Sequence, residues 1–293
     1  MSAQALALVI LAGLVHAGWN IVAKQVGGDA RFAFFVSVCQ TIFWAPLALW
    51  LGWRVLPDWG AAAWAIVVVS GVLHVAYFVT LLRGYRMADL TVVYPVARGT
   101  GPLLSFLLAA WVLGERVTAA GLLGLLGVVA GVLLISGAPR LLRSPATSDT
   151  GGRMRQGLWY GVVTGVWIAA YTLVDGYGVK VLAMSPILLE FMATLVRLAL
   201  LAPIALSDRA HTARLWRGQW RGALVVAVFS PIAYVMVLYA MQSAPLSHVA
   251  PAREVSMLFA ALLGGRLLGE GDRLARIVGA VLIGCGVAAL ALG

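Results

Sequence analysis

Three arginines lie inside apolar stretches of this sequence, where a charge is costly, and two of them, Arg98 and Arg253, recur in similar surroundings. Arg98 lies within residues 90–113, and Arg253, followed directly by Glu254, lies within residues 245–267. If these stretches cross a membrane, each cation costs about 2.5–3.5 kcal/mol at the centre of a helix. A guanidinium can bind a carboxylate or a phosphate through its planar fork. Both arginines are therefore candidate substrate contacts, and the equal alternative is a structural ion pair with Glu254.

Residues that loosen helices surround both cations. Proline removes a backbone donor, and neighbouring helices or water must then satisfy the freed carbonyl groups. The predicted gate or hinge positions are Pro95, Gly99, Pro102 and Pro251. Glu254 is also a candidate proton-coupling residue, because a buried acid favours its protonated form. A permanent ion pair is an equally good interpretation of Glu254.

Polar and aromatic side chains recur inside the other apolar stretches. The predicted cavity residues are Trp19, Asn20, His74, Tyr77, Tyr94, Arg98, Thr164, Trp167, Tyr171, Tyr234, His248, Arg253 and Glu254. Residues 164, 167 and 171, followed by Asp175 near the outer surface, fall on one helix face, which must meet protein or water rather than lipid. Such a face suits a substrate with an apolar body and charged groups, as amino acids have. The alternative is a packing face against the first span.

Two of these residues are predicted to line a cavity because they lie deep in the membrane. His74 and Tyr77 are three residues apart near the middle of an apolar run, too deep for the aromatic belts at membrane interfaces. Asn20 is open to two interpretations, cavity wall or a hydrogen bond between helices worth under about 2 kcal/mol.

Composition identifies the class of protein. The chain has 293 residues, of which 62% are hydrophobic and 11% are charged, whereas a soluble domain carries about 25% charged residues. We predict an all-α, polytopic membrane protein. A span needs about 20 apolar residues, and the candidates are 3–23, 32–52, 61–82, 90–113, 118–137, 157–178, 185–206, 222–242, 245–267 and 274–292.

The basic residues predict the orientation. With the N-terminus outside, fifteen of the 21 Lys and Arg residues fall in cytoplasmic connections, and only Arg54, Arg116 and Lys180 fall outside. Positive charge concentrates in cytoplasmic loops. The sequence therefore predicts that both termini are periplasmic. The net charge of +10 is explained by these loops and does not indicate nucleic-acid binding.

The two halves of the chain resemble each other. An offset of 155 residues pairs Arg98 with Arg253, Leu-Gly-Glu at 113–115 with 268–270, Gly124 with Gly279, and Gly131 with Gly286. An odd number of spans in each half places the copies in opposite orientations, as in the inverted repeats of secondary transporters. We predict a first repeat at 1–137, a basic cytoplasmic linker at 138–156, and a second repeat at 157–293.

Trp19-Asn20 near the end of the first span and Leu-Gly-Glu after the fourth and ninth resemble the EamA-type drug/metabolite transporter (DMT) superfamily. The resemblance covers essentially the whole chain and is closest to YddG-type exporters of amino acids in bacterial inner membranes. It implies a ten-helix basket with a cavity lined by spans one, three, four, six, eight and nine. Many relatives carry a cation in both the second and seventh spans, whereas here Arg197 has Gln40 opposite.

The predicted function is export of aromatic and other small amino acids by alternating access. The alternative is a transporter of another small metabolite, a drug or a nucleotide sugar. We expect no enzymatic activity, no cofactor and no metal, since the sequence contains no phosphate-binding loop, His-Glu-x-x-His motif or paired intramembrane aspartates. The expected partners are a small-molecule substrate and the lipid bilayer, without nucleic acid. One chain is enough to enclose a pathway, and a homodimer is compatible with the sequence.

Overall fold

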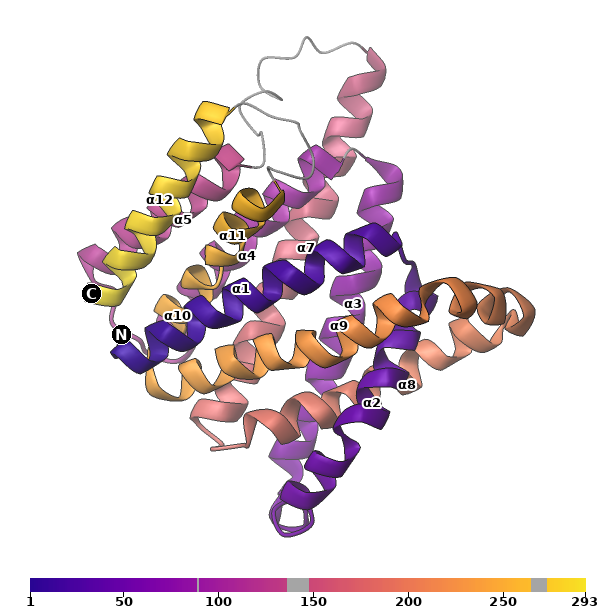
Figure 1. Ribbon diagram of the computed structural model, residues 1–293. Coiled ribbons are helices and arrows are strands. Elements are labelled where there is room, and N and C mark those ends of the chain that lie inside the picture. The colour runs from indigo at the N-terminus through magenta and orange to yellow at the C-terminus, as the bar shows by residue number, and fades with distance from the viewer. Residues whose placement is uncertain (89, 136–147, 265–272) are drawn as a thin grey trace.

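The computed structural model of the protein describes residues 1–88, 90–135, 148–264 and 273–293, and every regular element in these residues is a helix (Figure 1). The helices are α1 (Ala3–Val26), α2 (Ala30–Gly52), the 3-10 turn η1 (Leu56–Asp58), α3 (Ala61–Met87), α4 (Leu90–Val112), α5 (Ala119–Ile135), α7 (Ser148–Lys180), α8 (Pro186–Leu206), α9 (Arg209–Ser243), α10 (Leu246–Ala252), α11 (Val255–Gly264) and α12 (Arg273–Leu292). The all-α prediction is confirmed.

Seven of these helices are long and apolar enough to cross a membrane, namely α1, α2, α3, α4, α7, α8 and α9. The fifth and tenth predicted spans correspond to the shorter apolar stretches 119–135 and 277–292. The ninth corresponds to two short helices, α10 and α11. Residues 148–156, predicted to belong to a linker, form the first turns of α7. The rest of that linker, and the second Leu-Gly-Glu at 268–270, lie outside the described residues.

The two cation-bearing stretches fold differently. α4 is continuous through Pro95, Gly99 and Pro102, so three of the four predicted hinge positions lie inside an unbroken helix. Pro251 instead lies beside a true break, because α10 ends at Ala252 and α11 begins only after residues 253–254. The charged pair thus occupies the point where the helix is interrupted.

The helix pairs that are in contact match when each helix is replaced by the corresponding helix of the other half of the chain. α1 packs against α9 and α11, and α7 packs against α3 and α4. α2 packs against α9, and α8 packs against α3. The counterparts of α1, α2 and α3 are α7, α8 and α9. With these exchanged, the α1–α9 pair becomes the α7–α3 pair, and the α2–α9 pair becomes the α8–α3 pair.

Glycines bring α5 and α12 into backbone contact. A Cβ atom added at Gly124 would lie 2.7 Å from the carbonyl oxygen of Gly286, and one added at Gly286 would lie 2.7 Å from that of Gly124. Further along, Gly131 and Gly279 face each other in the same way, so the two helices run antiparallel. These four glycines are the ones that the 155-residue offset pairs in the sequence.

We expect Gly286→Ala to destabilise the protein by about 1–3 kcal/mol, because overpacking of this size strains the backbone. Gly284, two residues earlier in α12, has no neighbouring atom within 4 Å of an added Cβ. Gly284→Ala is therefore the matched control and should be neutral or slightly stabilising, since alanine is the better helix former. Thermal unfolding of the purified proteins in detergent measures the difference, and equal effects would contradict this packing.

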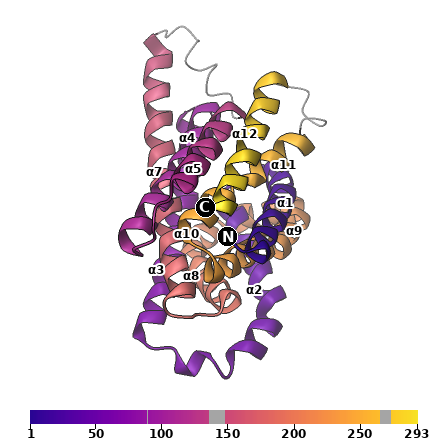
Figure 2. The same ribbon diagram turned by 90° about the vertical axis from the view of Figure 1, so that its left-hand side faces the viewer.

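The two ends of the helix bundle differ. Both termini lie side by side in Figures 1 and 2, where the Met1 amino group donates to the carbonyl of Ala291 at 2.6 Å. We call this the terminal end, together with the turns at 113–118 and 181–185. The opposite, basic end carries the turns at 27–29 and 207–208. Large apolar side chains fill the terminal end, including the fully buried Leu189, Leu238, Met241 and Leu246.

Glu115 of the first Leu-Gly-Glu ties three elements together at the terminal end. Its carboxylate accepts hydrogen bonds from the backbone N–H groups of Leu246 and Ser247, both at 2.8 Å, at the start of α10. Lys180, the last residue of α7, donates to the same carboxylate at 2.7 Å. Gly114 supplies the left-handed turn that leads into it, with φ of 65°.

This arrangement makes stability at the terminal end depend on pH. Partial burial alone would raise the pKa of Glu115, but the hydrogen bonds from Lys180, Ser247 and Leu246 outweigh burial and hold the pKa below its ordinary value. A depressed pKa contributes stability above the unfolded-state value of about 4.3, and that contribution is lost as pH falls through the lower folded-state pKa.

We therefore expect Glu115→Gln to cost about 1.5–3 kcal/mol at neutral pH, as for hydrogen bonds to a charged group. The gap between variant and wild type should close as the pH is lowered below about 4.3. Unfolding curves of both proteins in detergent over a pH series measure this gap. A gap that stays constant across the series would contradict the role given to the Glu115 carboxylate.

Candidate functional site

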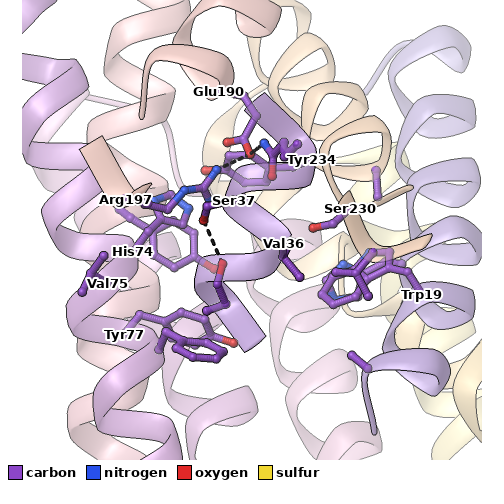
Figure 3. Close-up of a pocket in the computed structure, with 18 of the residues that line it drawn as sticks. Trp19, Val36, Ser37, His74, Val75, Tyr77, Glu190, Arg197, Ser230 and Tyr234 are labelled. Carbon is purple, nitrogen blue, oxygen red and sulfur yellow. Dashed lines mark hydrogen bonds and ion pairs between the residues drawn. The ribbon is translucent and has the colours of Figure 1, made fainter. Parts of the chain in front are cut away.

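A cavity of about 240 Å³ lies at the centre of the bundle (Figure 3). Its polar and aromatic lining residues are His16, Trp19, Phe32, Ser37, Gln40, His74, Tyr77, Phe78, Arg98, Tyr171, Glu190, Arg197, Ser230, Tyr234 and Arg253. They come from α1, α2, α3, α4, α7, α8, α9 and the break after α10. The walls on α2 and α8 are additional to the helices that the family resemblance implies.

The cavity extends toward the basic end. Its lining begins at Phe32 near the start of α2 and does not continue beyond Gln40, at the middle of that helix. On α8, which runs toward the basic end, it reaches Leu201, close to the last turn. The packed apolar core of the terminal end separates the cavity from the side on which the chain begins and ends.

Seven of the thirteen predicted cavity residues line this cavity, and they are Trp19, His74, Tyr77, Arg98, Tyr171, Tyr234 and Arg253. The His74 ring stacks on Tyr171 with centroids 4.2 Å apart, and the Tyr77 ring meets Tyr171 edge-on at 5.8 Å. Figure 3 shows His74 and Tyr77 on one side and Trp19 on the opposite side. The aromatic wall therefore combines residues of α1, α3, α7 and α9.

The other six predicted residues contact protein instead. The amide of Asn20 donates to the carbonyl of His16 at 2.8 Å, and the Trp167 indole donates to Thr80 at 3.1 Å. The Tyr94 hydroxyl contacts the Met257 sulfur at 3.1 Å.

Thr164 is fully buried, next to Gly165, which packs on α4. His248 lies at the terminal end against Gly121 of α5. Glu254 binds Arg98. The residues predicted to share one face of 164–175 therefore have different surroundings. Trp167 contacts α3, Thr164 lies beside the contact with α4, and Tyr171 lines the cavity.

Arg98 and Glu254 form a buried ion pair across the two halves, with Arg98 Nη1 3.3 Å from Glu254 Oε1. The side chains are 12% and 1% exposed, respectively. A second guanidinium nitrogen of Arg98 lies 3.4 Å from His16 Nε2, and the guanidinium lies over the Tyr94 ring at 5.4 Å. Arg98 is thus surrounded by protein partners, with one edge in the cavity wall.

Arg253 is placed differently from its repeat counterpart. Its guanidinium lies 6.0 Å from the centre of the Tyr171 ring. Among the described residues no ion pair or hydrogen bond of its side chain is observed. A buried cation without a counter-ion is costly. Arg253 therefore presents an available positive charge to the cavity.

The α2–α8 wall carries a polar network that the sequence analysis did not include among its sites. Glu190 Oε1 accepts from Arg197 at 2.6 Å and from the Gln40 amide at 2.9 Å. Gln40 also donates to Thr194 at 2.6 Å, and Arg197 donates to Thr194. The sequence feature that could have indicated this network is the presence of two opposite charges in the predicted seventh span. Glu190 and Arg197 are seven residues apart and so lie on the same face of one helix.

Comparison with known proteins agrees with this architecture. The model of the EamA-like transporter family matches residues 3–137 and, a second time, residues 155–292. The chain belongs to the EamA-like transporter family. This EamA protein is thus a multi-pass membrane transporter of the DMT superfamily, and the family consists of transporters rather than enzymes.

The fold of this EamA protein also resembles that of solved proteins. One structure, described as "Crystal structure of protein", matches with a TM-score of 0.74 at 16% sequence identity. The match covers 100% of this chain and 98% of that chain, so the two share a fold over their whole length. No curated protein matches the sequence.

Proposed function

We propose that this EamA protein exports amino acids, aromatic and other small ones, by alternating access, as YddG-type members do. The observation that carries the proposal is the central cavity, whose aromatic wall lies between charged side chains. Arg253 offers a guanidinium to a substrate carboxylate. The rings of Tyr77 and Tyr171 suit an apolar or aromatic side chain and can attract an ammonium group over their faces.

A second free donor supports a substrate rich in oxygen acceptors. The indole N–H of Trp19 is buried and has no hydrogen-bond partner among the described residues. Buried donors without partners are costly. A carboxylate in the cavity would satisfy either this donor or the guanidinium of Arg253.

Cavity size favours amino acids over the larger alternative cargoes. At about 240 Å³, the cavity is smaller than the roughly 300–1,000 Å³ of pockets for drug-sized ligands. A nucleotide sugar or a bulky drug would require the helices to move apart. A small metabolite anion fits the arginines equally well, and a substrate panel distinguishes it from an amino acid.

We further propose that the chain has ten spans in two inverted five-helix repeats. The helix neighbours that map onto each other when the halves are exchanged support this arrangement. The antiparallel contact of α5 with α12, through glycines that the repeat makes equivalent, supports it independently. One such chain encloses the cavity, so a monomer suffices for transport, and a homodimer remains compatible.

The proposed location is a bacterial inner membrane with both termini in the periplasm. Under this orientation the basic end faces the cytoplasm, as the distribution of Lys and Arg favours. The cavity then opens toward the cytoplasm, which is the loading state of an exporter. A reporter fused after Gly293 tests the orientation, and activity restricted to the cytoplasm would overturn it.

Transport itself is tested with purified protein in liposomes loaded with labelled amino acids and, separately, with labelled small carboxylates. We expect counterflow of at least one aromatic amino acid. Flux of carboxylates alone would show that the substrates are small carboxylates rather than amino acids. No flux of any compound in either panel would reject the proposal.

A further inference from the structure

A buried acid outside the Arg98–Glu254 pair lies on α7, at Asp175. This residue is 1% exposed, and no ion pair with it is observed among the described residues. The Tyr234 hydroxyl donates to Asp175 Oδ2, whereas Oδ1 has no hydrogen-bond partner there. An ionised carboxylate that is buried without a counter-ion is expensive, and binding a proton removes that cost.

The surroundings of Asp175 contain few compensating groups. α9 contributes Tyr234, α3 contributes His74 and the nearby hydroxyl of Ser70, and α7 itself contributes Tyr171. From α8, the mutually paired Glu190 and Arg197 act at longer range, and Arg253 lies beyond the Tyr171 ring. Because the α8 charges neutralise each other, Asp175 gains little from them.

Asp175 also lies between the cavity and the terminal end. On the cavity side, Tyr234 both lines the cavity and binds the carboxylate. On the other side, the adjacent Gly176 packs against Leu246 and Met241, which belong to the apolar core of the terminal end. Water can therefore reach the Asp175 carboxyl group past Tyr234 when the cavity is open at the basic end. It can reach the group from the other side when the helices of the terminal end move apart.

We propose that Asp175 is the proton-binding site of this transporter and that Tyr234 connects it to the substrate cavity. The inference rests on the proposed transport function but not on amino acids as the cargo. It also assigns proton coupling to Asp175 rather than to Glu254, whose charge is already compensated by Arg98.

The step is a simple protonation. A proton from cavity water adds to Oδ1 of the Asp175 carboxylate, which has no hydrogen-bond partner among the described residues, and gives a neutral carboxylic acid. The neutral acid is a weaker acceptor, because charge-assisted hydrogen bonds are about twice as strong as neutral ones. The Tyr234 hydroxyl is then free to turn toward the cavity, which links proton binding to the substrate. Release returns the same proton to water.

The first experiment compares flux with and without a pH gradient across liposomes. In the wild type the gradient should change flux severalfold, whereas in Asp175→Asn the ratio of the two fluxes should fall to one. Asp175→Glu should restore part of the response. Asp58→Asn, which removes an exposed acid of the turn after α2, is the charge-matched control and should behave as wild type. A gradient response in Asp175→Asn equal to that of wild type would overturn the proposal.

The second experiment needs no substrate, and so separates this proposal from the choice of cargo. Infrared difference spectra of the purified protein during a pH titration should contain a C=O band of a protonated carboxylic acid that appears at higher pH than the bands of the exposed acids, and Asp175→Asn should lack that band. An unchanged band in the variant would place the proton elsewhere and overturn the proposal. The band in a protein that transports no amino acid would leave proton binding supported and the substrate class rejected.

Discussion

Arg253→Ala should lower amino-acid flux by about 10- to 100-fold. A hydrogen bond to a charged group contributes about 1.5–3 kcal/mol, and each 1.4 kcal/mol corresponds to about a tenfold change in binding. Because the Arg253 side chain has no ion pair among the described residues, its removal deprives no buried acid of a partner. We therefore expect the thermal stability of the variant to stay close to that of wild type.

Initial rates of labelled amino-acid uptake in liposomes, paired with unfolding curves in detergent, measure both effects. Arg253→Lys keeps the charge without the planar fork and should retain an intermediate rate. Wild-type flux in Arg253→Ala would remove this residue from the substrate site and leave the aromatic wall as the remaining candidate.

Arg98→Ala should instead lower the free energy of unfolding by about 3–5 kcal/mol, because it leaves Glu254 buried and unpaired. The Glu254 side chain is only 1% exposed, so the variant leaves its charge in a buried position without the guanidinium. Replacing both partners, as Arg98→Leu with Glu254→Leu, should recover most of the loss, since an apolar pair of similar volume is often neutral or stabilising.

A double-mutant cycle on thermal unfolding tests this expectation, with Arg98→Leu and Glu254→Leu as the single variants. A strongly favourable coupling energy identifies a structural pair. Additive losses in the double variant would instead show that the two side chains act independently, and would return Arg98 to the list of substrate contacts.

These two arginines occupy matching positions of the two halves in the sequence and yet have different partners. Arg98 projects from a continuous helix, meets the acid of the opposite half and is held by His16 and Tyr94. Arg253 lies where α10 ends, directly before that same acid. Glu254 follows Arg253, whereas Gly99 follows Arg98, so the two arginines share a single neighbouring acid. That acid pairs with Arg98.

The two buried acids Glu254 and Asp175 also differ in their partners. In the sequence, Glu254 and Asp175 are both acids within apolar stretches. The structure pairs Glu254 with a cation more than 150 residues earlier in the chain. It leaves Asp175 with a hydroxyl group. The difference depends on neighbours that are distant in sequence.

Local patterns in the sequence were enough to predict the helical class, seven of the spans, the two EamA-like halves and the family resemblance. Each of these depends on local properties, namely the length and hydropathy of a segment, or on motifs such as Leu-Gly-Glu that recur at a constant offset. The sequence also indicated seven of the cavity residues, because a polar aromatic deep in an apolar helix has few environments available.

Which polar residues share the cavity depends on the tertiary structure. The rotation of each helix about its axis is set by packing against helices far away in sequence, and composition does not specify it. That rotation turns Trp167 toward Thr80 and Tyr171 toward the cavity, although both lie on one side of α7. The same packing brings α2 and α8 together, and so creates the Gln40–Glu190–Arg197 wall.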